Sequence, residues 1–205
     1  MGRMKTSEKH AMVHAEALQR YNEIQTALRD ERIQCVEDRR FATLAGAQWE
    51  GRLGEQFANK PRFEVNKTRL GCMRILNEER ANPVDVRFIP RDGDAFDDAD
   101  LCNELLRADE QDSCAEEAYD NSNDEAVLGG FGAYRLRADY EDETDENDDR
   151  QRIRFEPITD ADQSVWFDLN SKRMDKSDAG HCFVVTSMTR AAYKKEWKDD
   201  PASWP

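Results

Sequence analysis

The apolar residues of this chain change their spacing near Gly132, and that change limits the folds open to it. Before the glycine they recur at intervals of three and four residues, which is typical of amphipathic helices. After it, Tyr134, Leu136 and Ala138 alternate with charged residues, which is typical of half-buried strands. Helices followed by strands predict an α+β fold, with N-terminal long helices and then a mostly antiparallel sheet.

The first predicted helix runs from about Ser7 to Ala45, with Ser7 as its N-cap. Its apolar residues fall at steps of three, four and seven, so they share one face. That face carries Ala17, Tyr21, Ile24, Leu28 and Cys35. Three glycines on either side of Trp49 then interrupt the regular pattern.

The second predicted helix runs from about Phe63 to Glu79 and ends before Asn82-Pro83, because the residue before a proline avoids the helical region. Its buried stripe is predicted to be Leu70, Met73 and Leu76 or Asn77. After the proline, Val84, Val86 and Phe88 alternate with Asp85 and Arg87. This alternation predicts one half-buried strand near residues 84–89.

Two more helices are predicted before the change of spacing. The third is capped by Asp94 or Asp97 and continues to Ala108. The fourth places Ala115, Tyr119 and Ala126 on one face and ends at Gly129-Gly130. Strand patterns follow around residues 134–138, 153–155, 165–167 and 183–185. The chain is predicted to be one domain, or one large piece of a bigger one: mainly helical over 1–130, mainly β over 131–190, and beginning a further helix over 191–205.

The composition favours a protein that depends on partners and argues against a free DNA-binding protein. Charged residues make up 36% of the chain and hydrophobic residues 38%, so a core can form but is expected to be thin. The formal net charge of −14 does not suit tight phosphate binding. The five cysteines have long spacings and no paired motif, so they are predicted to be reduced. No signal peptide or membrane-spanning run is recognisable, and no membrane partner is expected.

The most acidic stretch lies between the first two strand patterns. Residues 139–149 hold eight acids and no base. Such a block repels itself, so it is predicted to be a solvated hairpin loop whose shortening leaves the fold intact.

Four patterns suggest chemistry, and each has a simpler interpretation. The stretch 91–100 lacks the ligand and glycine positions of a calcium loop, and we interpret it as a turn with a helix cap. The glycines at 129–132 lack a phosphate-loop pattern and precede a strand. His10 and His14 have no third ligand nearby and are predicted to be solvated. His181 and Cys182 are adjacent in a strand, so their side chains point to opposite faces. No catalytic residue, metal site or cofactor is therefore predicted.

Three stretches have a distinctive sequence: Asn82–Gly93, Gly132–Asp142 and Ile153–Met188, with DLNSKRMDKSDAGHC at residues 168–182 as the most specific block. Together they resemble the portal, or head-to-tail connector, proteins of short-tailed phages of the Salmonella-phage podovirus type. A weaker match surrounds Gln48-Trp49, and the resemblance covers roughly residues 40–193. The residues that carry it are Asn82, Pro83, Asp85, Gly132, Tyr140, Glu141, Asp142, Glu156, Pro157, Asp168, Asn170, Ser171, Lys172, Met174, Asp175, Lys176, Ser177, Asp178, His181 and Cys182.

The resemblance implies a structural virion protein without catalytic residues. It implies a subunit of a dodecameric ring at the capsid portal vertex, made in the bacterial host cytoplasm. The implied partners are other copies of the chain, the large terminase subunit, and tail, adaptor, scaffolding or coat proteins. Double-stranded DNA would pass through the ring without sequence-specific binding. The chain resembles the N-terminal, wing-like portion of the family, and it stops where a new helix begins.

Because family chains continue for several hundred residues, helical stripes such as Tyr21, Ile24 and Leu28 are expected to be exposed in this piece. Two other hypotheses stay open. One is a metal-dependent phage nucleic-acid enzyme that uses the acids within residues 92–100. The other is a prophage remnant that shares the portal fold but has no present function.

Overall fold

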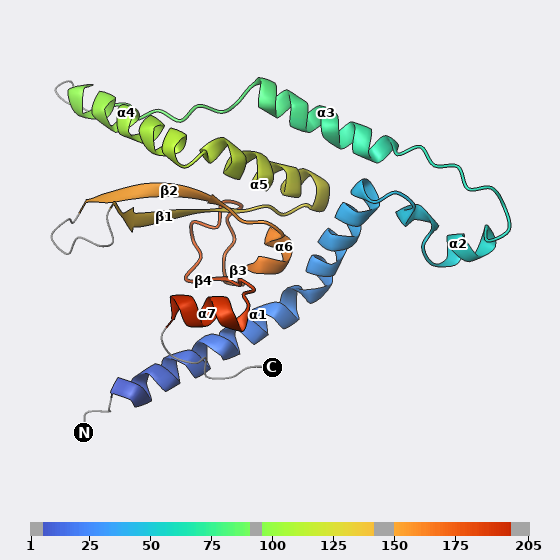
Figure 1. Cartoon of the computed structure of the whole chain (residues 1–205), viewed down its shortest axis with the longest axis horizontal. Coiled ribbons are helices and arrows are strands. Elements are labelled where there is room, and N and C mark those ends of the chain that lie inside the picture. Colours follow the sequence, from blue (N-terminus) through green and yellow to red (C-terminus); the bar gives the residue numbers. More distant parts are fainter. Residues whose placement is uncertain (1–5, 91–95, 142–149, 198–205) are drawn as a thin grey trace. The chain divides into compact units, whose positions relative to one another are not determined.

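The computed structural model describes residues 6–90, 96–141 and 150–197. Its helices and strands are drawn in Figure 1. Their bounds are α1 Thr6–Thr43, the 3-10 helix η1 Ala47–Trp49, α2 Arg52–Gln56, α3 Lys67–Ala81, α4 Phe96–Asp112, α5 Ala115–Gly129, β1 Tyr134–Tyr140, β2 Gln151–Pro157, α6 Ala161–Ser164, β3 Val165–Phe167, β4 Cys182–Val184 and α7 Arg190–Glu196. Long helices precede small antiparallel sheets, which confirms the predicted α+β class.

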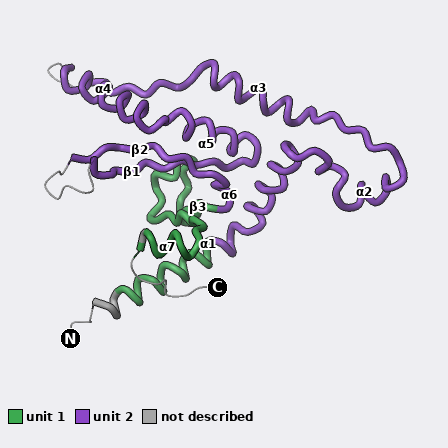
Figure 2. Tube along the Cα trace, viewed as in Figure 1, with its two compact units in different colours: residues 1–24, 164–205 green, residues 25–163 purple. Residues whose placement is uncertain are grey.

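The chain folds into two compact units (Figure 2). Unit 2, residues 25–163, holds the second half of α1 and the elements from α2 to the β1–β2 hairpin. Unit 1 joins residues 1–24 to residues 164–205, so it combines the start of α1 with the β3–β4 pair and α7. The contacts within each unit define its own core.

Unit 2 has a thin core between the hairpin and the helices that cover it. Phe155 on β2 is 6% exposed and packs with Ala115 and Ala118 on α5. The ring of Tyr119 meets Tyr134 and Phe155 edge-on, with centroids 5.3 and 5.7 Å apart. Its hydroxyl donates to Glu110 at 2.8 Å, and burial together with this bond raises the pKa of Tyr119. Two small alanines allow α5 to approach the strand closely, so one aromatic side chain fills most of the space.

Charged side chains are also buried in unit 2. Glu125 and Asp162 are 9% and 3% exposed, and the guanidinium of Arg39 lies 3.5 Å from the first and 3.2 Å from the second. The guanidinium of Arg32 stacks over the ring of Phe131 at 3.8 Å. Burial lowers the pKa of Arg32. These charged side chains are buried where a larger core would have apolar ones. Their ion pairs therefore contribute to the stability of unit 2, since an unpaired buried charge would destabilise it.

In unit 1, aromatic side chains of β3 and β4 pack against the N-terminal half of α1. The ring of Tyr21 meets Trp166 and Phe183 edge-on, with centroids 6.0 and 5.8 Å apart. Ile24 is only 3% exposed, and Val165 and Trp166 are buried as well. The expectation that Tyr21 and Ile24 form an exposed stripe is therefore wrong, because β3 and β4 of the same chain supply the aromatic partners. Leu28, which belongs to unit 2, is half-buried.

Most predicted helix ends agree with the structure, but α3 begins at Lys67 rather than near Phe63, because the Asn66 side chain accepts the N–H of Arg69 and caps the helix there. The first helix begins at Thr6, one residue before Ser7, so Ser7 lies inside α1 rather than at its N-cap. α5 ends at Gly129, and its C-cap Gly130 has a φ of 86, which is strained for other residues but open to glycine. α4 begins at Phe96, which puts Asp97 in its first turn; Asp94 lies outside the described residues.

The strand predicted near residues 84–89 is wrong. This segment is extended but pairs with no strand among the described residues. Val84 and Val86 are 87% and 68% exposed, so the alternation marks no buried face here. A strand needs a neighbouring strand to bond its backbone groups, and none of the described strands pairs with this segment.

The predicted stripe of α3 is wrong in part. Leu76 is buried, but Leu70 is 59% exposed and Met73 is 36% exposed. The face that packs on α5 carries Cys72, Leu76 and Glu79, since Asn123 of α5 donates to the Glu79 carboxylate at 3.1 Å. Because α5 offers polar side chains such as Asn123, α3 packs on it with the face that carries Leu76 and Glu79 and not with the more apolar face that carries Leu70 and Met73.

The region 131–190 contains every strand in the described residues, but 168–181 between β3 and β4 is a loop. β1 and β2 pair in register from Tyr134–Pro157 to Tyr140–Gln151. Residues 142–149 of the predicted acidic loop lie outside the described residues. α7 occupies the place of the predicted final helix, as far as Glu196.

Candidate functional site

The loop of residues 168–181 holds half of the residues that carry the family resemblance. It closes the β3–β4 hairpin: the N–H of Asp168 donates to the carbonyl of His181 at 3.1 Å, one step beyond the pairing of Phe167 with Cys182. The two ends of the loop are thus held together by the short sheet. The distinctive sequence between them folds on this base.

Asp178 braces the loop from inside. Its carboxylate accepts the hydroxyl of Ser171 at 2.8 Å, the N–H of Lys172 at 2.8 Å and the N–H of Arg173 at 3.3 Å. The Lys172 N–H, followed by the Ser171 hydroxyl, lowers the pKa of Asp178 below its ordinary 3.8. One side chain therefore ties the beginning of the loop to its end, with the help of charge-assisted hydrogen bonds.

Asp168 makes a second turn at the start of the loop. One of its oxygens accepts both the N–H and the side-chain amide of Asn170, at 3.1 and 3.0 Å. The other lies 3.7 Å from Nδ1 of His181, whose ring packs edge-on against Phe183. The Asn170 N–H, and then the His181 charge, lower the pKa of Asp168. A side-chain turn of this kind fixes backbone direction without regular secondary structure.

The tip of the loop is exposed and basic. Met174 is 97% exposed, and Lys172 and Arg173 beside it are exposed as well. Lys176 has a φ of 55, which is uncommon for a residue with a side chain. Within a chain of net charge −14, the braced backbone presents an apolar side chain among bases.

We predict that Asp178→Ala loosens this loop and leaves the rest of unit 1 folded. Lys172 and Arg173 lose the acceptor of their N–H groups, so their amides should exchange with solvent much faster, as NMR would measure. Asp175→Ala is the matched control, because within the described residues Asp175 accepts from Ser177 alone, at 3.2 and 3.1 Å. Equal exchange in both variants would show that Asp178 does not brace the loop.

The loop should also lose order in acid. The pKa of Asp178 is lowered in the folded chain, so its contribution is fully present above the ordinary 3.8 and is lost as the pH falls through the lower, folded value. Amide protection of Lys172 should therefore persist at pH 4 and disappear only in stronger acid. Loss of protection already near pH 6 would contradict this cause.

Several other residues of the resemblance serve the fold of unit 2. Asn82 ends α3, since its N–H donates to Glu78 and Glu79 carbonyls and its side chain donates to Glu78 at 3.0 Å. Glu141 and Glu156 pair with arginines across the hairpin, and Pro157 ends β2. Asp142 lies outside the described residues.

The patterns that suggested chemistry show no catalytic arrangement in the described part of the chain. Burial raises the pKa of the Cys182 thiol, which is the opposite of an activated nucleophile. His10 and His14 are exposed on α1. No group of three or more metal-ligating side chains occurs among residues 6–90, 96–141 and 150–197. Asp92 and Asp94 of the predicted acidic cluster lie outside these ranges. Within them, none of the helices has the length and apolar character needed to cross a membrane.

Comparison with known proteins gives the family. Residues 18–205 match the model of the family described as "Phage P22-like portal protein". The chain is also 39% identical over 197 residues to the portal protein of Acyrthosiphon pisum secondary endosymbiont phage 1. That alignment covers 93% of this chain and 27% of the relative, so the chain spans about a quarter of the relative's length. The residues that suggested a portal protein lie inside both matches, and the chain belongs to the P22-like phage portal protein family.

Proposed function

We propose that this chain is the N-terminal, wing-like part of a portal subunit, a structural component of the virion. In this proposal twelve subunits form a ring at one capsid vertex. A terminase pumps DNA through the ring, and tail or adaptor proteins later attach to it. The family match over residues 18–205 is the observation that carries the proposal.

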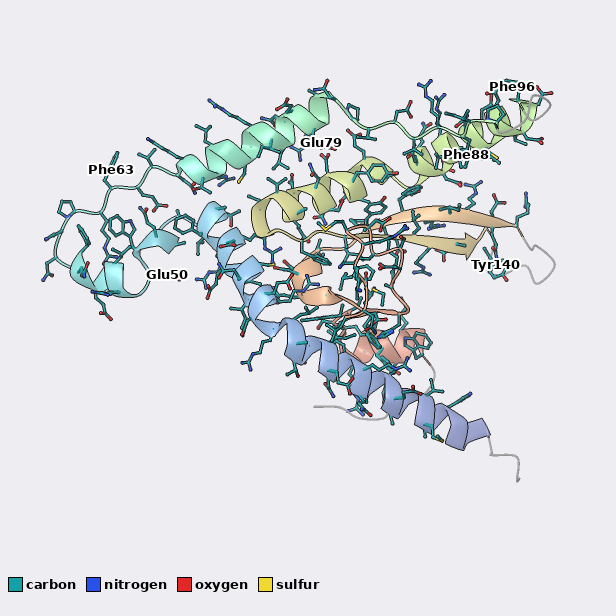
Figure 3. The ribbon with its side chains drawn as sticks, turned by 180° about the vertical axis from the view of Figure 1, so that it is seen from behind. Glu50, Phe63, Glu79, Phe88, Phe96 and Tyr140 are labelled. Carbon is teal, nitrogen blue, oxygen red and sulfur yellow. The ribbon has the colours of Figure 1, made fainter. Side chains whose placement is uncertain are left out.

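The surface of unit 2 supports a role in assembly. Large apolar side chains are exposed on the segments before and after α3, on α3 itself and on α4, among them Phe63 (83%), Ile75 (57%) and Phe96 (60%); Figure 3 labels Phe63 and Phe96. Exposed apolar side chains in such numbers mark surfaces that partners cover. The acidic net charge suits a wall past which DNA moves, since a basic wall would retain phosphates through counterion release.

The direct test is the presence of the chain in particles. Mass spectrometry of purified particles of the phage that encodes it should detect peptides from both units. Immunogold labelling should mark a single vertex of each particle. A chain that is abundant in the infected cell but missing from particles would overturn the proposal.

We predict that residues 1–205 alone do not form a stable twelve-subunit ring. Stable obligate interfaces bury upwards of roughly 2,000 Å², and a quarter of the relative's length supplies only part of each subunit face. The net charge of −14 adds repulsion between copies that salt screens within about 10 Å at 0.1 M. Mass photometry across a salt series should find monomers and small oligomers, increasing with salt. A homogeneous twelve-subunit species at low salt would show that this part carries the ring contacts by itself.

A further inference from the structure

The segment 83–89 has one backbone edge that no group in the described residues uses. The N–H of Phe88 donates to the side-chain oxygen of Asn103 at 2.8 Å, and the Asn103 amide donates back to the Phe88 carbonyl at 3.1 Å. In an extended chain the backbone groups of alternate residues point to opposite edges. Phe88 therefore faces α4, and the backbone groups of Asp85, Arg87 and Ile89 point the other way.

β1 has a matching open edge. The N–H of Glu141 donates to the carbonyl of Arg150 at 3.0 Å, which continues the register of β1 with β2. Residues 135, 137 and 139 therefore also direct their backbone groups toward β2. Leu136, Ala138 and Tyr140 direct theirs to the outer edge, where no strand pairs with β1 in the described part of the chain. Leu136 and Tyr140 are 56% and 50% exposed, so that edge is accessible.

We propose that segment 83–89 of one copy of the chain adds as a parallel strand to the outer edge of β1 in a second copy. In parallel pairing, the N–H and C=O of one residue bond to the two residues that flank its opposite neighbour. With Val86 opposite Ala138, the three outward residues of β1 meet the backbone groups of Pro83, Asp85, Arg87 and Ile89. Proline supplies only a carbonyl in this arrangement, so its missing N–H is not needed.

The side chains fit the same register on both faces. On one face Val84, Val86 and Phe88 lie opposite Leu136, Ala138 and Tyr140. On the other, Asp85 lies opposite Arg137 and Arg87 lies opposite Asp139. Opposite charges directly across a sheet are favourable, and like charges are not. An antiparallel arrangement with Asp85 opposite Arg137 would instead place Arg87 against Arg135, so charge favours the parallel one.

The partner is a second copy because one chain cannot make this pairing with itself in the observed fold. Figure 1 shows α3 and the segment after it on one side of α4 and α5, and the β1–β2 hairpin on the other. Figure 3 labels Phe88 on the segment and Tyr140 at the end of β1. The contact joins two different surfaces, so it can repeat around a ring. The choice of partner rests on the proposed function, and the strand register rests on the residues above.

The test exchanges the two charges of the segment in the chain of residues 1–205. Asp85→Arg with Arg87→Asp keeps the net charge and the exposed ion pair that these residues make at 2.7 Å. It places like charges opposite Arg137 and Asp139 of the neighbouring copy. Self-association in low salt, measured by sedimentation at concentrations up to about 1 mM, should weaken about tenfold, because two cross-strand pairs change sign. The matched control is Glu16→Arg with Arg20→Glu, an exposed pair on α1 that should leave association unchanged.

Hydrogen exchange of individual backbone amides tests the proposed register of the two strands. As concentration rises, the N–H groups of residues 85, 87, 89, 136, 138 and 140 should gain protection, and the gain should be lost in the exchanged variant. The alternate residues 84, 86 and 88 should not change. A chain that stays monomeric, or that associates equally well with exchanged charges, would overturn the strand pairing. Either result would leave the proposed function standing, because the presence of the chain in particles is tested by a separate experiment.

Discussion

Replacing Gly132 by alanine is expected to destabilise unit 2 by about 3 kcal/mol, at the upper end of the usual cost of overpacking. A Cβ at this position would lie 1.8 Å from the carbonyl oxygen of Ser122 and 3.0 Å from the backbone nitrogen of Ala126. Both are backbone atoms of α5, so neither can rotate away. The chain leaving α5 must pass this close to the helix before β1 begins, and only glycine allows it.

Urea unfolding followed by circular dichroism measures the effect as a lower midpoint. Gly71→Ala is the matched control, because Gly71 lies inside α3 with no atom within 4 Å of a Cβ. Alanine there should stabilise the chain by about 0.5–1 kcal/mol. If both variants unfolded at the wild-type midpoint, the close contact of Gly132 with α5 would not exist in solution.

Local signals in the sequence predicted the elements that depend on local chemistry. Gly130 adopts a positive φ at the end of α5, and α3 ends at Asn82, directly before Pro83. The alternation after Gly132 predicted both strands of the hairpin. These features arise from a few neighbouring residues, so a single sequence contains enough information to place them.

Features that depend on distant partners could not be predicted in the same way. The segment 84–89 has the alternation of a strand, but the alternation does not say whether a neighbouring strand exists. The apolar stripe of α3 pointed to Leu70 and Met73, although the partner helix selects Leu76 and polar neighbours. In each case the missing information is the identity of the packing partner.

The unusual sequence of the candidate site pointed to the loop, but it did not predict the hydrogen bonds that hold the loop together. The block at residues 168–182 was singled out as a resemblance, but nothing in the sequence identified Asp178 as the brace. The buried charges were missed as well. A signal for Glu125 was present: it lies seven residues after Ala118 and ten after Ala115, on the buried face of α5. An acid on the face that small apolar residues mark for burial indicates a buried polar contact.

Glu125→Ala is expected to destabilise unit 2 by about 2–4 kcal/mol, because it removes an acceptor from groups that stay buried. The Glu125 carboxylate accepts the N–H of Asp160 at 2.7 Å and the N–H of Ala161 at 2.8 Å. Ala161 is fully buried, so its N–H cannot bond to water instead. Arg39 also loses one of its three carboxylates but keeps Asp160 and Asp162.

The loss of unfolding free energy distinguishes the buried contacts of Glu125 from the effect of removing any acid from the surface of α5. Glu117→Ala removes an exposed acid from the first turn of the same helix and should change stability by about 0.3–1 kcal/mol at most. Glu125→Gln should fall between the two, since its amide oxygen can accept only one of the two N–H groups while its NH₂ faces the other. Urea midpoints should therefore fall in the order wild type, Glu117→Ala, Glu125→Gln, Glu125→Ala. Equal midpoints for the two alanine variants would mean that water reaches the turn at residues 160–161, and the buried pairing of Arg39 with Glu125 would then contribute little to the fold.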